Sequence, residues 1–176
     1  LEANPMAMDF DGALLAAQTG KVDMVVSGVT VTEPRKLIYD FTISYNTIHQ
    51  AIVSKDGAVK EEDLKDKIIG VQTGTTGMIY AQDDYSEDKV ISYDTYSKAF
   101  LALQNGQVDC VLLDDMVAYQ YIANIPGLAV QPTNYPEEEY AFGLTKGNTE
   151  LRDAVNAALQ ELIDNDTVAE IVAKYN

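Results

Sequence analysis

Three short segments of the chain combine residue types that could bind a small charged molecule. The first runs from Ser27 to Arg35 (SGVTVTEPR) and offers hydroxyls, a glycine backbone and a guanidinium. Arginine forks onto a carboxylate through two parallel hydrogen bonds, and neighbouring hydroxyl and N–H groups can fill the remaining lone pairs. The chain has only two arginines, Arg35 and Arg152, so the presence of one of them in this segment favours a role in binding a carboxylate. The alternative is a helix start with a solvated arginine.

The second and third segments each follow an expected strand. Residues 73–77 (TGTTG) lead into an expected helix, and the unpaired N–H groups of a helix start attract an anion. No lysine follows the second glycine, so the loop is not a P-loop, and a plain turn is the alternative. Asp114 could neutralise an ammonium group, or it could cap the next helix. The three segments together complement an α-amino acid.

Composition excludes several classes of function. The net charge of −16 would repel nucleic acid and anionic lipid, so we expect no nucleic-acid partner. A single cysteine, Cys110, excludes an internal disulfide and fits a buried apolar position. One histidine, His49, and no metal-ligand spacing lead us to expect no metal and no cofactor. The chain shows neither a membrane-length apolar run nor a signal segment, so we expect a mature or trimmed chain.

An internal repeat indicates the architecture. Residues 18–26 (QTGKVDMVV) and 104–112 (QNGQVDCVL) read almost alike, and each follows an Ala/Leu-rich run with helical spacing. A helix closed by glycine, here Gly20 or Gly106, and followed by a short buried strand explains both stretches. Polar residues just past such strands lie where open α/β sheets bind ligands. We therefore predict two related α/β lobes that share a cleft.

The remaining pattern predicts the other elements. We expect helices, capped among others by Asp11, Thr149 and Asp166, at 12–19, 60–66, 77–82, 96–105, 118–122, 149–163 and 167–174, with a short helix or turn from Thr32. We expect an edge strand at 1–8, a buried parallel strand at 22–26 and a hinge strand within 45–54. Further strands are expected at 68–72, 90–93, 128–131 and 140–144.

A family resemblance follows from longer motifs. Residues 8–45 (MDFDGALLAAQTGKVDMVVSGVTVTEPRKLIYDFTISY) resemble the first-lobe signature of the family 3 extracellular solute-binding proteins, the polar amino-acid receptors of ABC importers. GVQTGTTG, QNGQVDCVLLD and YAFGLTKGNTELRDAVNAALQELIDNDT continue the resemblance in the family's order. It implies an α/β clamshell of the periplasmic-binding-protein type II, with two doubly wound lobes joined by hinge strands. Lobe 1 would be partial and comprise residues 1–48 and 143–176, and lobe 2 would comprise residues 49–142.

The resemblance also implies a role for individual residues. Phe10 would stack on the ligand side chain, and Arg35 would fork onto the ligand carboxylate. Thr76 would add a backbone N–H to that carboxylate, and Asp114 would take the ammonium group. The expected contacts are completed by the Gly28 carbonyl and Thr30 at the α-ammonium or α-carboxylate, by Gln72 at the ligand side chain, and by the neighbouring Ser27 and Thr75.

The ligand is expected to be a polar or basic amino acid. Asp11 and Asp115 lie next to contact positions and could favour a cationic side chain, with a helix cap as the alternative role of each, whereas Gln72 suits an amide such as glutamine. Glutamate and aspartate would need a second cation for the side-chain carboxylate. The resemblance implies an extracytoplasmic location, an ABC transporter permease as partner and no catalysis.

Several alternatives stay open. The family's initial strand and helix are not matched, so the first lobe is expected to be incomplete. A second copy could supply this layer through a domain-swapped homodimer. The chain could instead be a truncated relic or a sensor module without ligand. A cyclohexadienyl-dehydratase-like enzyme is the remaining alternative, because some members of this fold act on cyclic acids.

Overall fold

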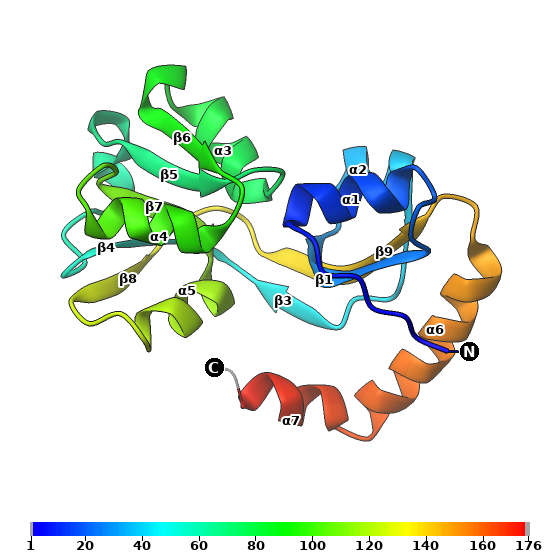
Figure 1. Cartoon of the computed structure of the whole chain (residues 1–176). Helices are drawn as coiled ribbons and strands as arrows, with labels where there is room; N and C mark the ends of the chain where they lie inside the picture. Colours follow the sequence, from blue (N-terminus) through cyan, green and yellow to red (C-terminus); the bar gives the residue numbers. More distant parts are fainter. Residues whose placement is uncertain (1, 175–176) are drawn as a thin grey trace.

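The computed structural model describes residues 2–174 and contains two β-sheets with helices packed around them (Figure 1). The first sheet has the order β1-β9-β2, and β3 also pairs with β9. The second sheet has the order β6-β5-β7-β4-β8. The first sheet consists of β1 (Met24–Thr30), β2 (Tyr39–Phe41), β3 (Asn46–Ile48) and β9 (Glu138–Thr145). The second consists of β4 (Gln50–Lys55), β5 (Ile69–Gln72), β6 (Val90–Tyr93), β7 (Cys110–Asp114) and β8 (Leu128–Pro132).

Two stretches of chain connect the sheets. One passes through β3 and His49 into β4, and the other returns from β8 into β9. The expected crossing strand within residues 45–54 is therefore present, although it is interrupted at His49. Strand β9 pairs with the first sheet from Glu138 onward, where Glu138 lies opposite Ile48. The division into lobes at 48/49 and 142/143 stays a prediction.

The internal repeat produces two helices that end alike. Helices α1 (Phe10–Gln18) and α4 (Tyr96–Gln104) both have nine residues. Each is followed by a glycine with φ of +72°, Gly20 or Gly106, in the left-handed conformation that closes a helix without a Cβ penalty. The predicted helix ends are confirmed.

The strands that follow the two helices differ. Strand β7 is buried throughout and lies between β5, its parallel neighbour, and β4, its antiparallel neighbour. Strand β1 is an edge strand that pairs antiparallel with β9, and Val26 is 68% exposed. The prediction of a buried parallel strand at 22–26 is therefore wrong. A run of apolar residues does not determine which strand lies beside it, and here that strand arrives from the hinge in the opposite direction.

The other helices are close to their expected places. They are α2 (Glu33–Ile38), α3 (Thr76–Asp84), α5 (Asp115–Ile122), α6 (Thr149–Asp164) and α7 (Thr167–Ala173), with short 3-10 segments η1 (Glu61–Asp66) and η2 (Glu87–Lys89). Thr32 caps α2, and Asp166 precedes α7 as expected.

Three local predictions are wrong. Asp9, not Asp11, caps α1, because its Oδ1 accepts a hydrogen bond from the Gly12 N–H at 2.8 Å. Asn148, not Thr149, precedes α6. Residues 2–8 form no strand, since no described strand pairs with them, and Leu1 lies outside the described residues.

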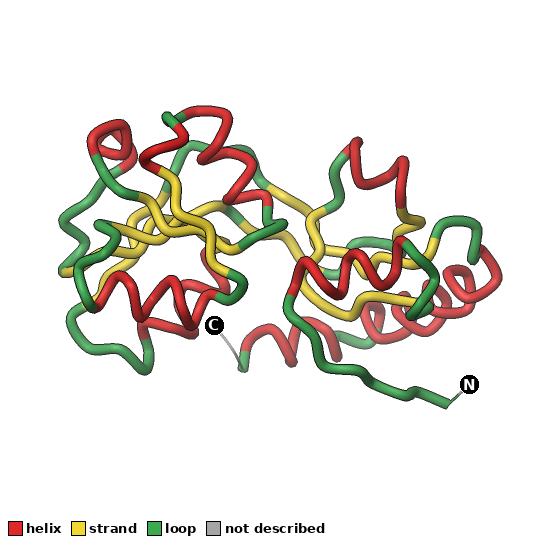
Figure 2. Tube along the Cα trace, turned by 45° about the horizontal axis from the view of Figure 1, so that its top comes forward, coloured by secondary structure: helices red, strands yellow, loops and turns green. Residues whose placement is uncertain are grey.

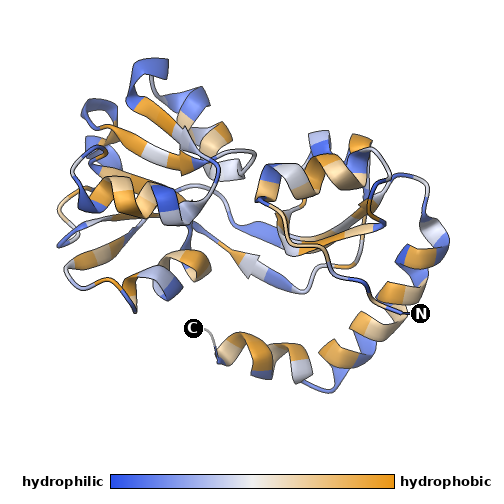
Figure 3. Cartoon of the chain, viewed as in Figure 1, coloured by the Kyte–Doolittle hydropathy of each residue, from blue (hydrophilic) through white to orange (hydrophobic). Residues whose placement is uncertain are grey.

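Apolar side chains pack on both faces of the second sheet. Figure 2 shows helices on both sides of this sheet, and Figure 3 shows that its strands are largely hydrophobic. One cluster gathers around Phe100 and Leu113, and the other contains Ile52, Leu64 and the fully buried Cys110. A smaller cluster packs α1 against β1 and β2. The second sheet is therefore the more completely covered of the two. Of the described helices, none has the length and apolar character that crossing a membrane requires.

Candidate functional site

A cavity of about 1530 Å³ is lined by residues from both sheets and from the segment before α1. All nine residues expected to contact a ligand line this cavity: Phe10, Ser27, Gly28, Thr30, Arg35, Gln72, Thr75, Thr76 and Asp114. They come from α1, β1, α2, the segment from the end of β5 to the start of α3, and the end of β7. Residues distant in sequence are thus brought together, although their roles stay predictions.

Arg35 bridges elements of the two sheets. It lies on α2 and is 8% exposed. Its Nη1 donates to the Thr30 carbonyl, and its Nη2 donates to the Gly74 carbonyl, both at 2.8 Å. The guanidinium carbon also lies 5.9 Å from the centre of the Phe10 ring. Burial lowers the pKa of Arg35, whereas the charges of Glu138 and Asp114 raise it. A fixed, desolvated guanidinium is suited to a ligand carboxylate.

The Gly/Thr loop forms the start of α3. The Thr75 hydroxyl accepts from the Met78 N–H at 3.2 Å and donates to the Gln72 carbonyl at 2.8 Å. Gly74 has φ of +82°, which explains a glycine at this turn. The predicted helix start is confirmed. It directs Thr76, which is 5% exposed, toward the first sheet, and its hydroxyl oxygen lies 3.5 Å from that of Thr30.

Asp114 ends β7 and is 7% exposed. It precedes α5 but makes no side-chain capping bond. Instead it accepts hydrogen bonds from the Tyr140 hydroxyl and, at 2.5 Å, from Gln50 Nε2. Burial raises the pKa of Asp114 to about 6, and the charge of Glu138 adds to that rise, while the bonds from Tyr140 and Gln50 oppose it. Such a carboxylate gains strongly from a cation placed beside it.

Sequence reasoning missed the residues that hold Asp114. Gln50 is fully buried, and Tyr140 is 3% exposed. Glu138, 5% exposed, accepts from the Thr76 hydroxyl at 2.7 Å and from Gln50 Nε2 at 3.0 Å. Glu138 is one of three consecutive glutamates, so its sequence context gives no signal.

Two glycines make room for this arrangement. A Cβ on Gly28 would lie 2.6 Å from the Tyr140 ring, and a Cβ on Gly77 would lie 2.9 Å from Gln50 Oε1. Neither contact is tolerable without movement. Gly28 was expected here for its carbonyl, and the structure adds this steric reason.

Asp11, Asp115 and His49, which the sequence also offered as candidates, do not line the cavity. Asp11 lies beside the Gly74 turn, and Asp115 accepts from the Met116 N–H at 2.7 Å. His49 is about half exposed, with Nε2 3.9 Å from a Glu137 carboxylate oxygen. Of the described residues, no group of three or more His, Cys, Asp or Glu could hold a metal ion.

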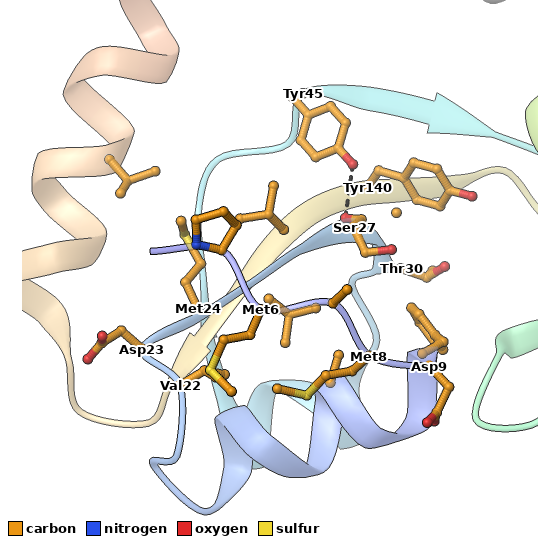
Figure 4. Close-up of a pocket in the computed structure, with 18 of the residues that line it drawn as sticks. Met6, Met8, Asp9, Val22, Asp23, Met24, Ser27, Thr30, Tyr45 and Tyr140 are labelled. Atoms are coloured by element: carbon orange, nitrogen blue, oxygen red, sulfur yellow. Dashed lines mark hydrogen bonds between the residues drawn. The ribbon is translucent and has the colours of Figure 1, made fainter. Parts of the chain in front are cut away.

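The cavity continues into an apolar slot beside β1 (Figure 4). Met6 and Met8 of the N-terminal segment line the slot together with Val22 and Met24. Leu151, Ala154 and Val155 of α6 also line it. Near the cleft, the Tyr45 hydroxyl donates to the Ser27 carbonyl at 3.1 Å. Strand β1, beside the slot, forms an edge of the first sheet, and no other described strand pairs with that edge.

Comparison with known proteins gives concordant matches. Residues 1–176 match the sequence profile of the bacterial extracellular solute-binding proteins, family 3. The ABC transporter arginine-binding protein 1 of Escherichia coli strain K12 is 34% identical over 161 residues, covering 91% of this chain and 65% of that protein. The L-cystine-binding protein TcyJ of the same strain is 30% identical over 180 residues, covering 99% of this chain and 68% of that protein.

Solved structures agree with these matches. An ancestral arginine-binding protein bound to glutamine has a TM-score of 0.89 and 39% identity, covering 97% of this chain and 78% of that chain. The arginine-, lysine-, histidine-binding protein ArtJ from Geobacillus stearothermophilus has a TM-score of 0.88 and 37% identity, covering 95% and 75%. The expected α/β fold is confirmed, and the chain spans 65% and 68% of the lengths of the two curated relatives.

Proposed function

We propose that this chain, which belongs to the bacterial extracellular solute-binding proteins of family 3, captures a polar or basic amino acid for an ABC importer. One observation carries the proposal: Arg35 and Asp114, both buried, line the same cavity. Among residues 2–174, no basic nitrogen comes within 4.0 Å of the Asp114 carboxylate. A buried carboxylate without a cation is costly, and an α-ammonium group would relieve that cost.

Each end of an amino acid has a counterpart in the cavity. The α-carboxylate would lie against Arg35, the Thr76 N–H and the hydroxyls of Ser27 or Thr30. The α-ammonium group would lie against Asp114 and the Gly28 carbonyl. The ligand side chain would then meet the remaining contacts, Phe10, Gln72 and Thr75. The relatives named for arginine and cystine, and the arginine-binding protein solved with glutamine, support an amino-acid ligand without selecting one.

We propose binding without turnover. The relatives reported above are named for binding. His49, the single histidine of the chain, lies outside the cavity lining. An extracytoplasmic location and delivery to a permease belong to the same proposal and are supported by the family match.

The lobe division and the homodimer are further parts of this proposal. Lobe 1 would comprise residues 1–48 and 143–176, and lobe 2 would comprise residues 49–142. In the proposed homodimer, formed by domain swapping, the second copy would cover the apolar slot beside β1. Light scattering gives the solution mass: a dimer supports the exchange, and a monomer that binds amino acids contradicts it.

A thermal-shift panel of the twenty amino acids tests the proposed function. A ligand at 100 times its dissociation constant adds about 2.7 kcal/mol of stability. For a chain of this length that corresponds to a rise in melting temperature of roughly 5–11 °C. The deaminated and decarboxylated analogues of each hit serve as matched controls and should give no shift. If no amino acid raises the melting temperature, the proposal is wrong, and recovery of a chemically altered ligand would indicate an enzyme.

A further inference from the structure

Two buried side chains, Gln50 and Glu138, lie directly beside cavity-lining groups without lining the cavity themselves. Glu138 comes from β9 of the first sheet, and Gln50 comes from β4 of the second. Glu138 Oε2 accepts from the Thr76 hydroxyl, and Glu138 Oε1 accepts from Gln50 Nε2. The same Nε2 donates to Asp114. One amide group therefore joins two buried carboxylates across the hinge.

The orientation of the Gln50 amide is fixed by its surroundings. Turning the amide over would place Oε1 against both carboxylates, which is repulsive. In the orientation present, Oε1 is buried, has no hydrogen-bond partner and faces Gly77. An unpaired buried acceptor is costly, so the two carboxylates hold the amide at the expense of its oxygen. Gln50 connects the two charges but does not neutralise them.

The charges around the ligand position do not balance. Arg35 contributes one positive charge, and the Asp114 and Glu138 carboxylates contribute two negative charges. Among the described residues, neither carboxylate has a basic nitrogen within 4.0 Å. Lys21 also lines the cavity, but it is an exposed residue of the connection between α1 and β1. A zwitterionic amino acid adds no net charge, so it would leave the buried cluster negative.

We propose that Glu138 is a positioning residue that also biases the cavity toward amino acids with a cationic side chain. It positions Thr76 directly and Asp114 through Gln50, and its charge is the one that a zwitterion leaves uncompensated. The inference rests on the proposed function, because it assigns the ligand class of the same cavity. The sequence offered Asp11 and Asp115 as possible sources of negative charge, with helix capping as their alternative role, and did not indicate Glu138.

Arginine and citrulline form a ligand pair that isolates this charge, because citrulline replaces the guanidinium with a neutral urea of similar shape. The native chain should bind arginine more tightly than citrulline in isothermal titration calorimetry. Glu138→Gln keeps the size of the side chain and one acceptor oxygen, replaces the other oxygen with a donor amide group, and removes the charge. We expect it to reduce the arginine-to-citrulline preference roughly tenfold, the effect of one charge at about 10 Å in an effective dielectric of about 20.

Two further variants separate charge from structure. Glu139→Gln changes the next residue, which is exposed, and should leave the preference unchanged. Glu138→Asp keeps the charge on a shorter arm, so it should weaken both ligands while retaining the preference. The inference is overturned if Glu138→Gln keeps the native preference, if it weakens both ligands equally, or if the native chain binds neither ligand but binds a neutral amino acid. If the native chain binds no amino acid at all, the proposed function fails as well.

Discussion

Replacing Asp114 with asparagine should stabilise the ligand-free protein while it destroys ligand binding. The carboxylate is 7% exposed and has no cation within 4.0 Å among the described residues. Its ionised form is therefore unfavourable in the folded state until a ligand arrives. Asparagine keeps the shape and an acceptor for Gln50 Nε2 and carries no charge. Asp114 would then be a functional-site residue that lowers the stability of the ligand-free protein, as strained or charged residues at binding sites often do.

The magnitude follows from the pKa of Asp114. Burial raises this pKa from 3.8 to about 6 in the folded protein. The folded state then binds a proton more tightly than the unfolded state, so stability falls as pH rises from about 4 to about 6 and stays lower above that range. A difference of about two pKa units corresponds to roughly 3 kcal/mol at pH 7. Relaxation around the ionised group makes this figure an upper bound.

Urea and thermal denaturation without ligand measure the effect. At pH 7, Asp114→Asn should raise the melting temperature by up to roughly 6–12 °C, and below pH 4 it should match the native chain. Asp115→Asn changes the adjacent, partly exposed carboxylate and should give no such gain. An Asp114→Asn protein that is no more stable at pH 7, or that keeps the native pH dependence, would refute the reasoning. In titrations of a hit from the amino-acid panel, the same variant should lose far more affinity for the amino acid than for its deaminated analogue.

Further predictions concern the same cavity and the core. Amino-acid affinity should fall roughly tenfold between pH 7 and pH 5 in calorimetric titrations, because a proton competes with the ammonium group for Asp114, whose pKa is about 6. Arg35→Lys should lower amino-acid affinity at least about 100-fold with normal circular dichroism, because a lysine cannot fork onto a carboxylate; retained affinity would remove Arg35 from that role. Gly28→Ala should cost about 1–3 kcal/mol in urea denaturation, because its Cβ would lie 2.6 Å from the Tyr140 ring. Burial raises the pKa of Cys110 to about 12, so iodoacetamide at pH 8 should label it only after unfolding, and rapid labelling of the native chain would contradict its burial.

Helix ends and helix starts were predicted well because the residues that mark them lie within or directly beside the helix in the sequence. A glycine after an Ala/Leu-rich run marks the ends of α1 and α4, and φ of +72° at both glycines is the physical basis of that signal. The α2 start, with Thr32 as cap and a proline in the first turn, is equally local. Strand pairing is not local. The repeat predicts similar strands after both helices, yet β7 is central and β1 is an edge strand.

The residues of the candidate site likewise differ in whether their local sequence context identifies them. The sequence identified residues that have a distinctive local context, and these residues line one cavity. Examples are Arg35, in a chain with two arginines, and the threonines of the Gly/Thr loop. Gln50 gave no signal, because a glutamine in an apolar strand is also compatible with an exposed edge. Its importance comes from two carboxylates that arrive from β7 and β9.

Glu138 shows why such a residue requires the fold. Residues 137–139 are identical in type, so composition, spacing and motif searches treat them alike. The antiparallel register with β3 distinguishes them, because Glu138 lies opposite Ile48 and is 5% exposed, whereas Glu139 lies opposite Thr47 and is exposed. Successive side chains of a strand point to opposite faces, so a shift of one residue would bury Glu139 and expose Glu138. The Glu138→Gln and Glu139→Gln pair therefore tests the register of β9 as well as the charge of the cavity, since equal effects from both variants would contradict each.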